Sequence, residues 1–226
     1  MIYLDHAAST RPYPEVAAYL SEHLLTDYGN PAALHAYGLS QEHILRDAKQ
    51  ELAQDLHTRP ENLILTSGAT EAANTAIRAV CRSRSHQGRH ILFGAGDHPA
   101  TSQLCHELKQ EQFEPEAIPL LANGKPDLDA MRRQLRPDTI LICLLAVNNE
   151  TGAITDLALA DQIRQKVAPQ ALLYVDYVQA WTKLNLNLDT SPADYAAFAG
   201  HKIHAPKGIG LLYVAPKRPF SPLIFG

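Results

Sequence analysis

The sequence predicts an α/β fold with a mostly parallel, seven-stranded sheet covered by helices. Short, continuously apolar runs alternate with longer segments of helical period. This alternation is typical of a parallel sheet whose strands are buried on both faces. With 226 residues, 46% of them hydrophobic, the chain is long and apolar enough to bury a substantial core.

Each element is predicted from its own stretch of the pattern, in chain order. The apolar runs predict strands at residues 63–66, 90–93, 117–120, 139–146, 172–176, 195–199 and 210–214. The segments of helical period predict helices at residues 14–25, 40–55, 71–82, 100–111, 128–135 and 157–167. Turn residues separate them at 123–126 and 136–138. Three prolines within residues 216–222 predict a linker, because proline cannot continue a helix or a central strand.

Charge and cysteine content narrow the class of function. The 20 Lys and Arg residues against 24 Asp and Glu residues give a net charge of −4 without runs of like charge, which disfavours a nucleic-acid or membrane surface. The stretch from Met1 to His6 lacks the regions of a signal peptide, so we expect a cytoplasmic protein. The three scattered cysteines, Cys81, Cys105 and Cys143, predict reduced thiols. Small-molecule chemistry is the favoured class.

The turn between the strand at 63–66 and the next helix is the most informative local pattern. Its sequence from Thr66 is Thr-Ser-Gly-Ala-Thr-Glu. Small residues at a helix N-terminus expose backbone N–H groups that favour a phosphate, and Thr70 could add a hydroxyl donor. The alternative is an ordinary helix start with Thr70 as N-cap and Gly68 as turn former. The glycine spacings of P-loops and dinucleotide-binding turns are missing.

Asp176 ends another apolar strand, and Gln179 follows it. Ligands of open α/β sheets bind beyond the carboxyl ends of the strands, so Asp176 is placed to meet one. Its carboxylate could pair with a heteroaromatic nitrogen and keep that nitrogen protonated. The alternative is that Asp176 caps a following helix.

Lys202 follows the strand at 195–199 and is enclosed by Gly and Pro residues. Partial desolvation there would make its amine a usable nucleophile for a Schiff base, whereas most lysines are solvated surface groups. His201 and His204 lack a third ligand at suitable spacing, so we predict no metal site.

Two loops supply weaker candidates. His98, before Pro99, could stack on a flat ligand or shuttle a proton, or it could be a turn residue. Asn148 and Asn149 follow the strand at 139–146 and could bind a ligand, although adjacent amides are more often turn formers.

Read together, these segments resemble the cysteine desulfurase branch of the class V aminotransferases, which are fold-type I pyridoxal-phosphate enzymes. The resemblance lies in YLDHAAST at 3–10, GNP at 29–31, TSGATE at 66–71, VNNETG at 147–152, VDYVQ at 175–179 and GHKIHAPKG at 200–208. It implies a pyridoxal 5'-phosphate cofactor whose Schiff base forms on Lys202. Asp176 would pair with the pyridine nitrogen, and His98 would stack on the ring and assist proton transfer.

The same resemblance assigns the remaining contacts. Thr70, with its neighbour Ala69, and His201 would hold the phosphate, while Asn149 and Gln179 would reach the phenolic oxygen or its surroundings. The substrate would be L-cysteine, converted to L-alanine with its sulfur passed to an enzyme cysteine as a persulfide. A homodimer, a possible sulfur-acceptor protein and a role in iron-sulfur cluster biogenesis are also implied.

Departures from the family pattern qualify the expected activity. The resemblance implies an N-terminal arm at 1–14, a pyridoxal-phosphate-binding large domain at 15–226 and no complete C-terminal domain, and hence a truncated protein with impaired turnover. Ala199 stands where the family usually has serine, and none of the three cysteines lies in a segment matching the persulfide cysteine. An inactive binding module, another class V aminotransferase and a selenocysteine lyase therefore remain alternatives.

Overall fold

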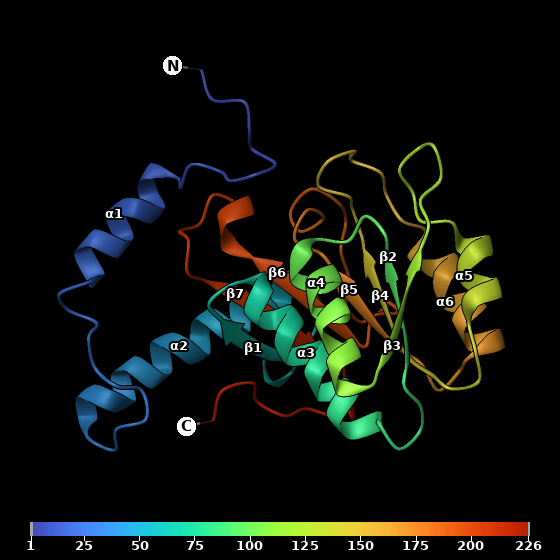
Figure 1. Ribbon diagram of the computed structural model, residues 1–226. Coiled ribbons are helices and arrows are strands. Elements are labelled where there is room, and N and C mark those ends of the chain that lie inside the picture. Colours follow the sequence, from blue (N-terminus) through green and yellow to red (C-terminus); the bar gives the residue numbers. More distant parts are fainter. Residues whose placement is uncertain (1, 226) are drawn as a thin grey trace.

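A single sheet of seven strands organises the chain in the computed structural model, which describes residues 2–225 (Figure 1). The strand order is β1-β7-β6-β5-β4-β2-β3. The strands are β1 (Leu63–Thr66), β2 (His90–Gly94), β3 (Glu114–Ile118), β4 (Thr139–Leu145), β5 (Leu172–Asp176), β6 (Tyr195–Ala199) and β7 (Gly210–Val214). Only the pairings of β7 with β1 and β6 are antiparallel, so β7 alone runs against the other described strands.

Helices cover both faces of this sheet. The described helices are α1 (Pro14–His23), α2 (Ala36–Asp55), α3 (Ala69–Arg84), α4 (Pro99–Glu107), α5 (Leu128–Gln134) and α6 (Leu157–Val167), with 3-10 turns at Pro60–Asn62, Leu108–Glu111 and Gly200–Lys202. Helices α3 and α4 lie over one face, and α5 and α6 lie on the other (Figure 1). Helix α1 stands to one side of the sheet and buries none of its residues.

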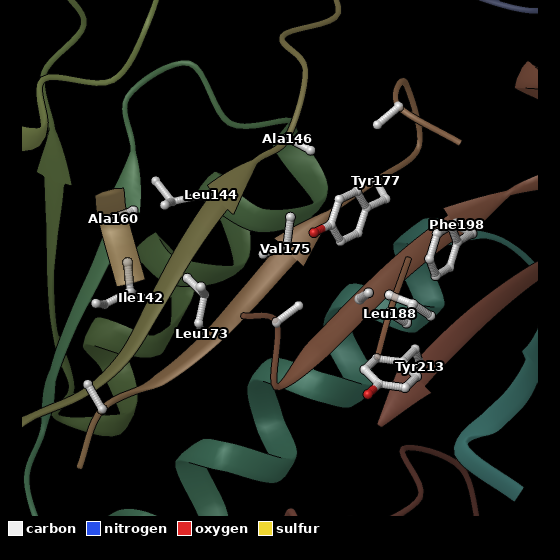
Figure 2. Packing of buried hydrophobic residues seen from close by; sticks show 14 of the residues in the cluster. Ile142, Leu144, Ala146, Ala160, Leu173, Val175, Tyr177, Leu188, Phe198 and Tyr213 are labelled. Carbon is white, nitrogen blue, oxygen red and sulfur yellow. The ribbon is translucent and has the colours of Figure 1, made fainter. Parts of the chain in front are cut away.

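The core is two apolar layers separated by the sheet. Successive side chains of a strand point to opposite faces. Leu173 and Val175 therefore pack on the α6 side, together with Ile142 and Leu144 of the neighbouring strand (Figure 2). Leu172, Tyr174 and Cys143 are among the residues that pack on the α3 side.

Most predicted elements are confirmed, and the differences have local causes. The predicted strand at 117–120 was wrong in position, because β3 spans Glu114–Ile118 and pairs only with β2 at the sheet edge. Three of the five β3 residues, Glu114, Glu116 and Ala117, are exposed at this edge, so an apolar run does not mark the strand. The helix predicted to start at residue 40 begins at Ala36, because the His35 side chain accepts a hydrogen bond from the Gly38 amide and caps it.

The remaining boundary differences are small. The first helix ends at His23 rather than residue 25, and the one predicted at 100–111 is α4 followed by a 3-10 turn from Leu108. Helix α3 starts at Ala69 with Gly68 at its N-cap position, so the alternative of Thr70 as N-cap was wrong. No helix follows Asp176 directly, so the alternative that it caps one was also wrong.

The three cysteines are free and buried, as the sequence predicts for reduced thiols. Burial raises the pKa of the Cys81 thiol to about 12 and that of Cys143 well above its ordinary value. Both therefore stay protonated at neutral pH and are poor nucleophiles. None of the helices within residues 2–225 is both long and apolar enough to span a membrane.

Candidate functional site

A cavity of about 670 Å³ lies at the carboxyl edge of the parallel strands. All eight predicted site residues line it, namely Ala69, Thr70, His98, Asn149, Asp176, Gln179, His201 and Lys202. They lie at or beyond the carboxyl ends of β1, β2, β4, β5 and β6, which run in the same direction and so end at the same edge. The fold thus brings together residues that lie up to 133 positions apart in the sequence, from Ala69 to Lys202.

One end of the cavity is the N-terminus of α3. The Ala69 and Thr70 amides make no hydrogen bond to residues 2–225, so both donors are free for a ligand. Glu71 holds the preceding turn, since its carboxylate accepts from the Ser67 amide at 2.7 Å and the Ser67 hydroxyl at 2.6 Å. These bonds lower the pKa of Glu71 and keep it charged. The arrangement presents N–H donors and the positive end of a helix dipole, which suit an anion.

The turn before α3 depends on a glycine from another strand. A Cβ on Gly210 would lie 2.6 Å from Gly68 Cα and 2.6 Å from the Phe198 carbonyl oxygen. Gly210 pairs with Thr66 at the start of β7. The absence of a side chain there lets the Ser67–Gly68 turn approach the sheet closely.

Asp176 supplies a buried carboxylate beside the cavity. Its side chain is 6% exposed, and its Oδ1 accepts from the Val178 amide at 2.9 Å. Burial raises the pKa of Asp176 to about 6, and the nearby Lys202 charge opposes this shift. Among the described residues it forms no salt bridge. A buried carboxylate in this state favours a cationic partner.

His98 caps α4 while facing the cavity. Its Nδ1 accepts from the Ala100 amide at 3.1 Å, which requires an unprotonated Nδ1 and leaves Nε2 to carry the hydrogen. Burial lowers the pKa of His98, and the charge of Lys202 lowers it further, so the ring is neutral at pH 7. The neighbouring Asp97 anchors this loop, because its two oxygens accept from the amides of Gly94 at 3.1 Å and Leu145 at 3.2 Å.

Lys202 ends the 3-10 turn after β6, and its amine meets the N-terminal arm. The Nζ atom donates to the Ala8 carbonyl at 2.7 Å and also to the Ala7 carbonyl. Partial burial lowers the pKa of Lys202, while Asp5 and Asp176 oppose this shift. A lower pKa leaves more of the amine unprotonated and nucleophilic.

Two amides occupy the cavity wall in different ways. Gln179 is buried and its Nε2 donates to the Ala7 carbonyl at 2.8 Å. Asn149 lines the cavity, whereas Asn148 is structural: its Oδ1 accepts from the Glu150 and Thr151 amides, each at 2.9 Å. Of the predicted asparagine pair, only Asn149 faces the cavity.

Two parts of the cavity wall were not predicted from the sequence: the N-terminal arm and Glu71. Asp5, Ala7, Ala8, Ser67 and Glu71 also line the cavity. The arm acts largely through backbone carbonyls, which carry no residue-specific signal. For Glu71 the sequence does contain a signal, because a serine and a glutamate spaced around a helix start can hydrogen-bond each other there.

These groups fit pyridoxal phosphate, the cofactor implied by the motif resemblance. The free amides at the start of α3 suit its phosphate. The buried, unpaired carboxylate of Asp176 suits a protonated pyridine nitrogen. Lys202 offers an amine for its aldehyde, and His98 a neutral ring on the same cavity.

Known proteins match this chain along its whole length. A family model described as Aminotransferase class-V matches residues 2–226. Cysteine desulfurase IscS of Methylococcus capsulatus is 37% identical over 217 residues, covering 96% of this chain and 53% of that protein. A cysteine desulfurase of Trichormus azollae is 36% identical over 227 residues, covering 100% of this chain and 56% of the relative. The chain thus spans about half the length of the curated relatives it matches.

Solved structures agree in fold. A NifS-like protein superposes with a TM-score of 0.96 at 30% identity, covering 100% of this chain and 62% of that protein. A structure described as SspA in complex with cysteine gives a TM-score of 0.94 at 27% identity, with coverages of 100% and 65%. The matching family model extends over nearly every residue. The chain belongs to the class V aminotransferase family, whose cysteine desulfurase relatives use pyridoxal phosphate.

Proposed function

We propose that this chain is the cofactor-binding part of a pyridoxal-phosphate-dependent cysteine desulfurase. The observation that carries the proposal is the convergence of all eight predicted residues on one cavity. The proposed reaction takes L-cysteine and a protein thiol to L-alanine and a protein persulfide. Two relatives named cysteine desulfurase and a structural neighbour described with cysteine support this substrate.

Polar groups that line the cavity would hold the cofactor. The Ala69 and Thr70 amides, the Thr70 hydroxyl and the His201 ring would hold the phosphate at the start of α3. Asn149 and Gln179, on the same cavity, would hold the phenolic oxygen. Gln179 already donates one hydrogen bond to the Ala7 carbonyl, which leaves its second N–H for the ligand.

Three residues control protons and attachment. Pyridoxal phosphate, when bound, supplies an electron sink for bond cleavage at the substrate amino acid. Lys202 would hold the cofactor through its Nζ amine. The Asp176 carboxylate, whose pKa burial raises to about 6, would hold a proton on the pyridine nitrogen. His98 moves a proton at Nε2, since its Nδ1 is committed to the Ala100 amide.

The sulfur-accepting thiol is not one of the three cysteines of this chain. Cys81, Cys105 and Cys143 are all buried on the α3 side of the sheet, away from solvent and absent from the cavity lining. We therefore expect the isolated chain to release little sulfide from L-cysteine. Robust turnover would contradict this assignment.

The wider context is proposed from the family resemblance. We propose a homodimer that passes sulfur to an acceptor protein in the cytoplasm, in iron-sulfur cluster biogenesis. Light scattering tests the dimer, and a monomer at micromolar concentration would count against it.

The cofactor assignment is tested by adding pyridoxal phosphate to the purified chain. We expect the near-ultraviolet to visible absorbance of lysine-bound cofactor, and borohydride reduction followed by peptide mapping should place the label on Lys202. Lys202→Ala should lose the band. Lys183→Ala is the matched control, because Lys183 lies close enough to donate to the Lys202 carbonyl at 3.4 Å but does not line the cavity. Equal bands in wild type and Lys202→Ala would refute the assignment.

A further inference from the structure

Thr10 lies under the turn that carries Lys202. It is 8% exposed, although the preceding residues of the arm are largely exposed. Its hydroxyl donates to the His201 carbonyl at 2.9 Å and accepts from the His204 amide at 2.7 Å. Its own amide donates to the same His201 carbonyl at 2.8 Å. The Thr10 side chain thus hydrogen-bonds the backbone on both sides of Lys202, at His201 before it and at His204 after it.

This turn needs support from outside itself. His204 has a φ of 63°, in the left-handed region that is unfavourable for residues other than glycine. Three further contacts with the arm surround it: the Tyr13 amide donates to the His204 carbonyl at 3.1 Å, the His204 ring bonds the Arg11 carbonyl at 2.8 Å, and the Tyr13 and His204 rings stack at 4.3 Å. The Thr10 hydroxyl is the side-chain acceptor for the amide of this left-handed residue.

The same arm then enters the cavity. Three residues before Thr10, the Ala7 carbonyl accepts from Gln179 and Lys202, and Ala8 accepts from Lys202. The arm is therefore fixed to the turn at Thr10 and to the Lys202 amine at Ala7 and Ala8. A displacement at Thr10 would move both the backbone that carries Lys202 and the acceptors that hold its amine.

We propose that Thr10 is a positioning residue, which locks the N-terminal arm to the Lys202 turn and so sets where the amine lies in the cavity. The proposal rests on the proposed function in taking Lys202 as the attachment point of the cofactor. Thr10 itself does not line the cavity, so it acts through His201, Lys202 and His204.

The test compares variants that remove or keep the hydroxyl. Thr10→Val keeps the shape and deletes both hydroxyl bonds, with Thr10→Ala as a second deletion should the valine variant not fold. Thr10→Ser keeps the bonds. Ser9→Ala is the matched control in the same arm, because the Ser9 hydroxyl makes no hydrogen bond within residues 2–225.

Two readouts are measured on each variant of the 226-residue chain. Titration with pyridoxal phosphate gives the apparent affinity for the Lys202-bound form. Competitive acetylation with mass spectrometry, without cofactor, gives the labelling rate of Lys202 relative to exposed Lys109. We expect Thr10→Val to weaken the affinity by about tenfold, as the loss of two buried hydrogen bonds allows. We also expect faster labelling of Lys202, whose amine is released from the arm carbonyls, and wild-type values for Thr10→Ser and Ser9→Ala.

The outcomes separate the two proposals. Wild-type behaviour of Thr10→Val in both readouts, or a Thr10→Ser variant as weak as Thr10→Val, would overturn the positioning role. If wild type forms no Lys202-bound cofactor, the proposed function fails. In that case the labelling ratio of Lys202 to Lys109 still tests the role of Thr10, because this measurement needs no cofactor.

Discussion

Replacing Asp176 with asparagine should stabilise the cofactor-free protein at neutral pH while impairing the site. Asp176 is buried at the end of β5 with one backbone hydrogen bond, to the Val178 amide, and no salt bridge among the described residues. Asparagine keeps an oxygen for the Val178 amide and carries no charge. The substitution therefore removes mainly the free-energy cost of burying an ionised carboxylate.

The magnitude follows from the pKa. Burial raises the pKa of Asp176 from its ordinary 3.8 to about 6. The folded state therefore prefers the protonated form, so its stability falls as the pH rises from about 3.8 to about 6 and the penalty is complete above that range. A shift of this size corresponds to ~3 kcal/mol at neutral pH, at ~1.4 kcal/mol per unit, as an upper figure. We expect Asp176→Asn to raise the free energy of unfolding by ~1–3 kcal/mol at about pH 7.5.

Urea denaturation of both proteins across the pH range checks this expectation. The gain should shrink as the pH is lowered below about 6 and vanish only at about pH 3, where Asp176 is protonated in both the folded and the unfolded state. Burial raises the pKa of Asp97, and the Asp176 charge raises it further, so removing that charge relieves the repulsion and adds to the gain at neutral pH. Exposed Asp189→Asn serves as control and should show no such pH-dependent gain. A less stable Asp176→Asn at neutral pH, or a difference independent of pH, would refute the reasoning.

Three further predictions concern the surroundings of the cavity. Ala199→Ser restores the hydroxyl that the family usually carries, and should tighten pyridoxal-phosphate binding by about tenfold in a spectroscopic titration; weaker binding would mean that the hydroxyl is buried without a partner. Gly210→Ala should lower the free energy of unfolding by ~1–3 kcal/mol in urea denaturation, because the new Cβ would meet Gly68 Cα at 2.6 Å, and an unchanged midpoint would contradict this close approach. Cys81, Cys105 and Cys143 should react with a thiol reagent only after unfolding, and rapid modification of the native protein would show that the α3 side is open.

The strands buried on both faces could be predicted closely from the sequence. The predicted bounds of the central strands β5, β6 and β7 match the structure, since central strands appear as short, continuous apolar runs. The bounds of the edge strand β1 also match, because its sequence is largely apolar even though only its first and last residues are buried. Strand β3 was misplaced because its outward residues, Glu114 and Glu116, are exposed at the sheet edge. An apolar run indicates burial, and β3 could not be located in this way because only Ile118 among its five residues is buried.

The candidate site could be predicted for residues that act through their side chains directly after a strand. Asp176 and Lys202 belong to this kind, and both line the cavity. The roles of Thr10 and Asp97 could not be found in this way, because their partners are backbone groups between 3 and 194 residues away in the chain. Such bonds become visible only once the fold brings the segments together.

The pairing of β5 with β6 limits which insertions and deletions the protein tolerates. Asp176 lies opposite Ala197, and it shares a sheet face with Leu172 and Tyr174 because side chains alternate along the strand. Inserting or deleting one residue within β5 would invert that alternation and turn the carboxylate to the opposite face. A scan of single-codon insertions and deletions should therefore find β5 intolerant, whereas the exposed turn at residues 121–123 should accept length changes.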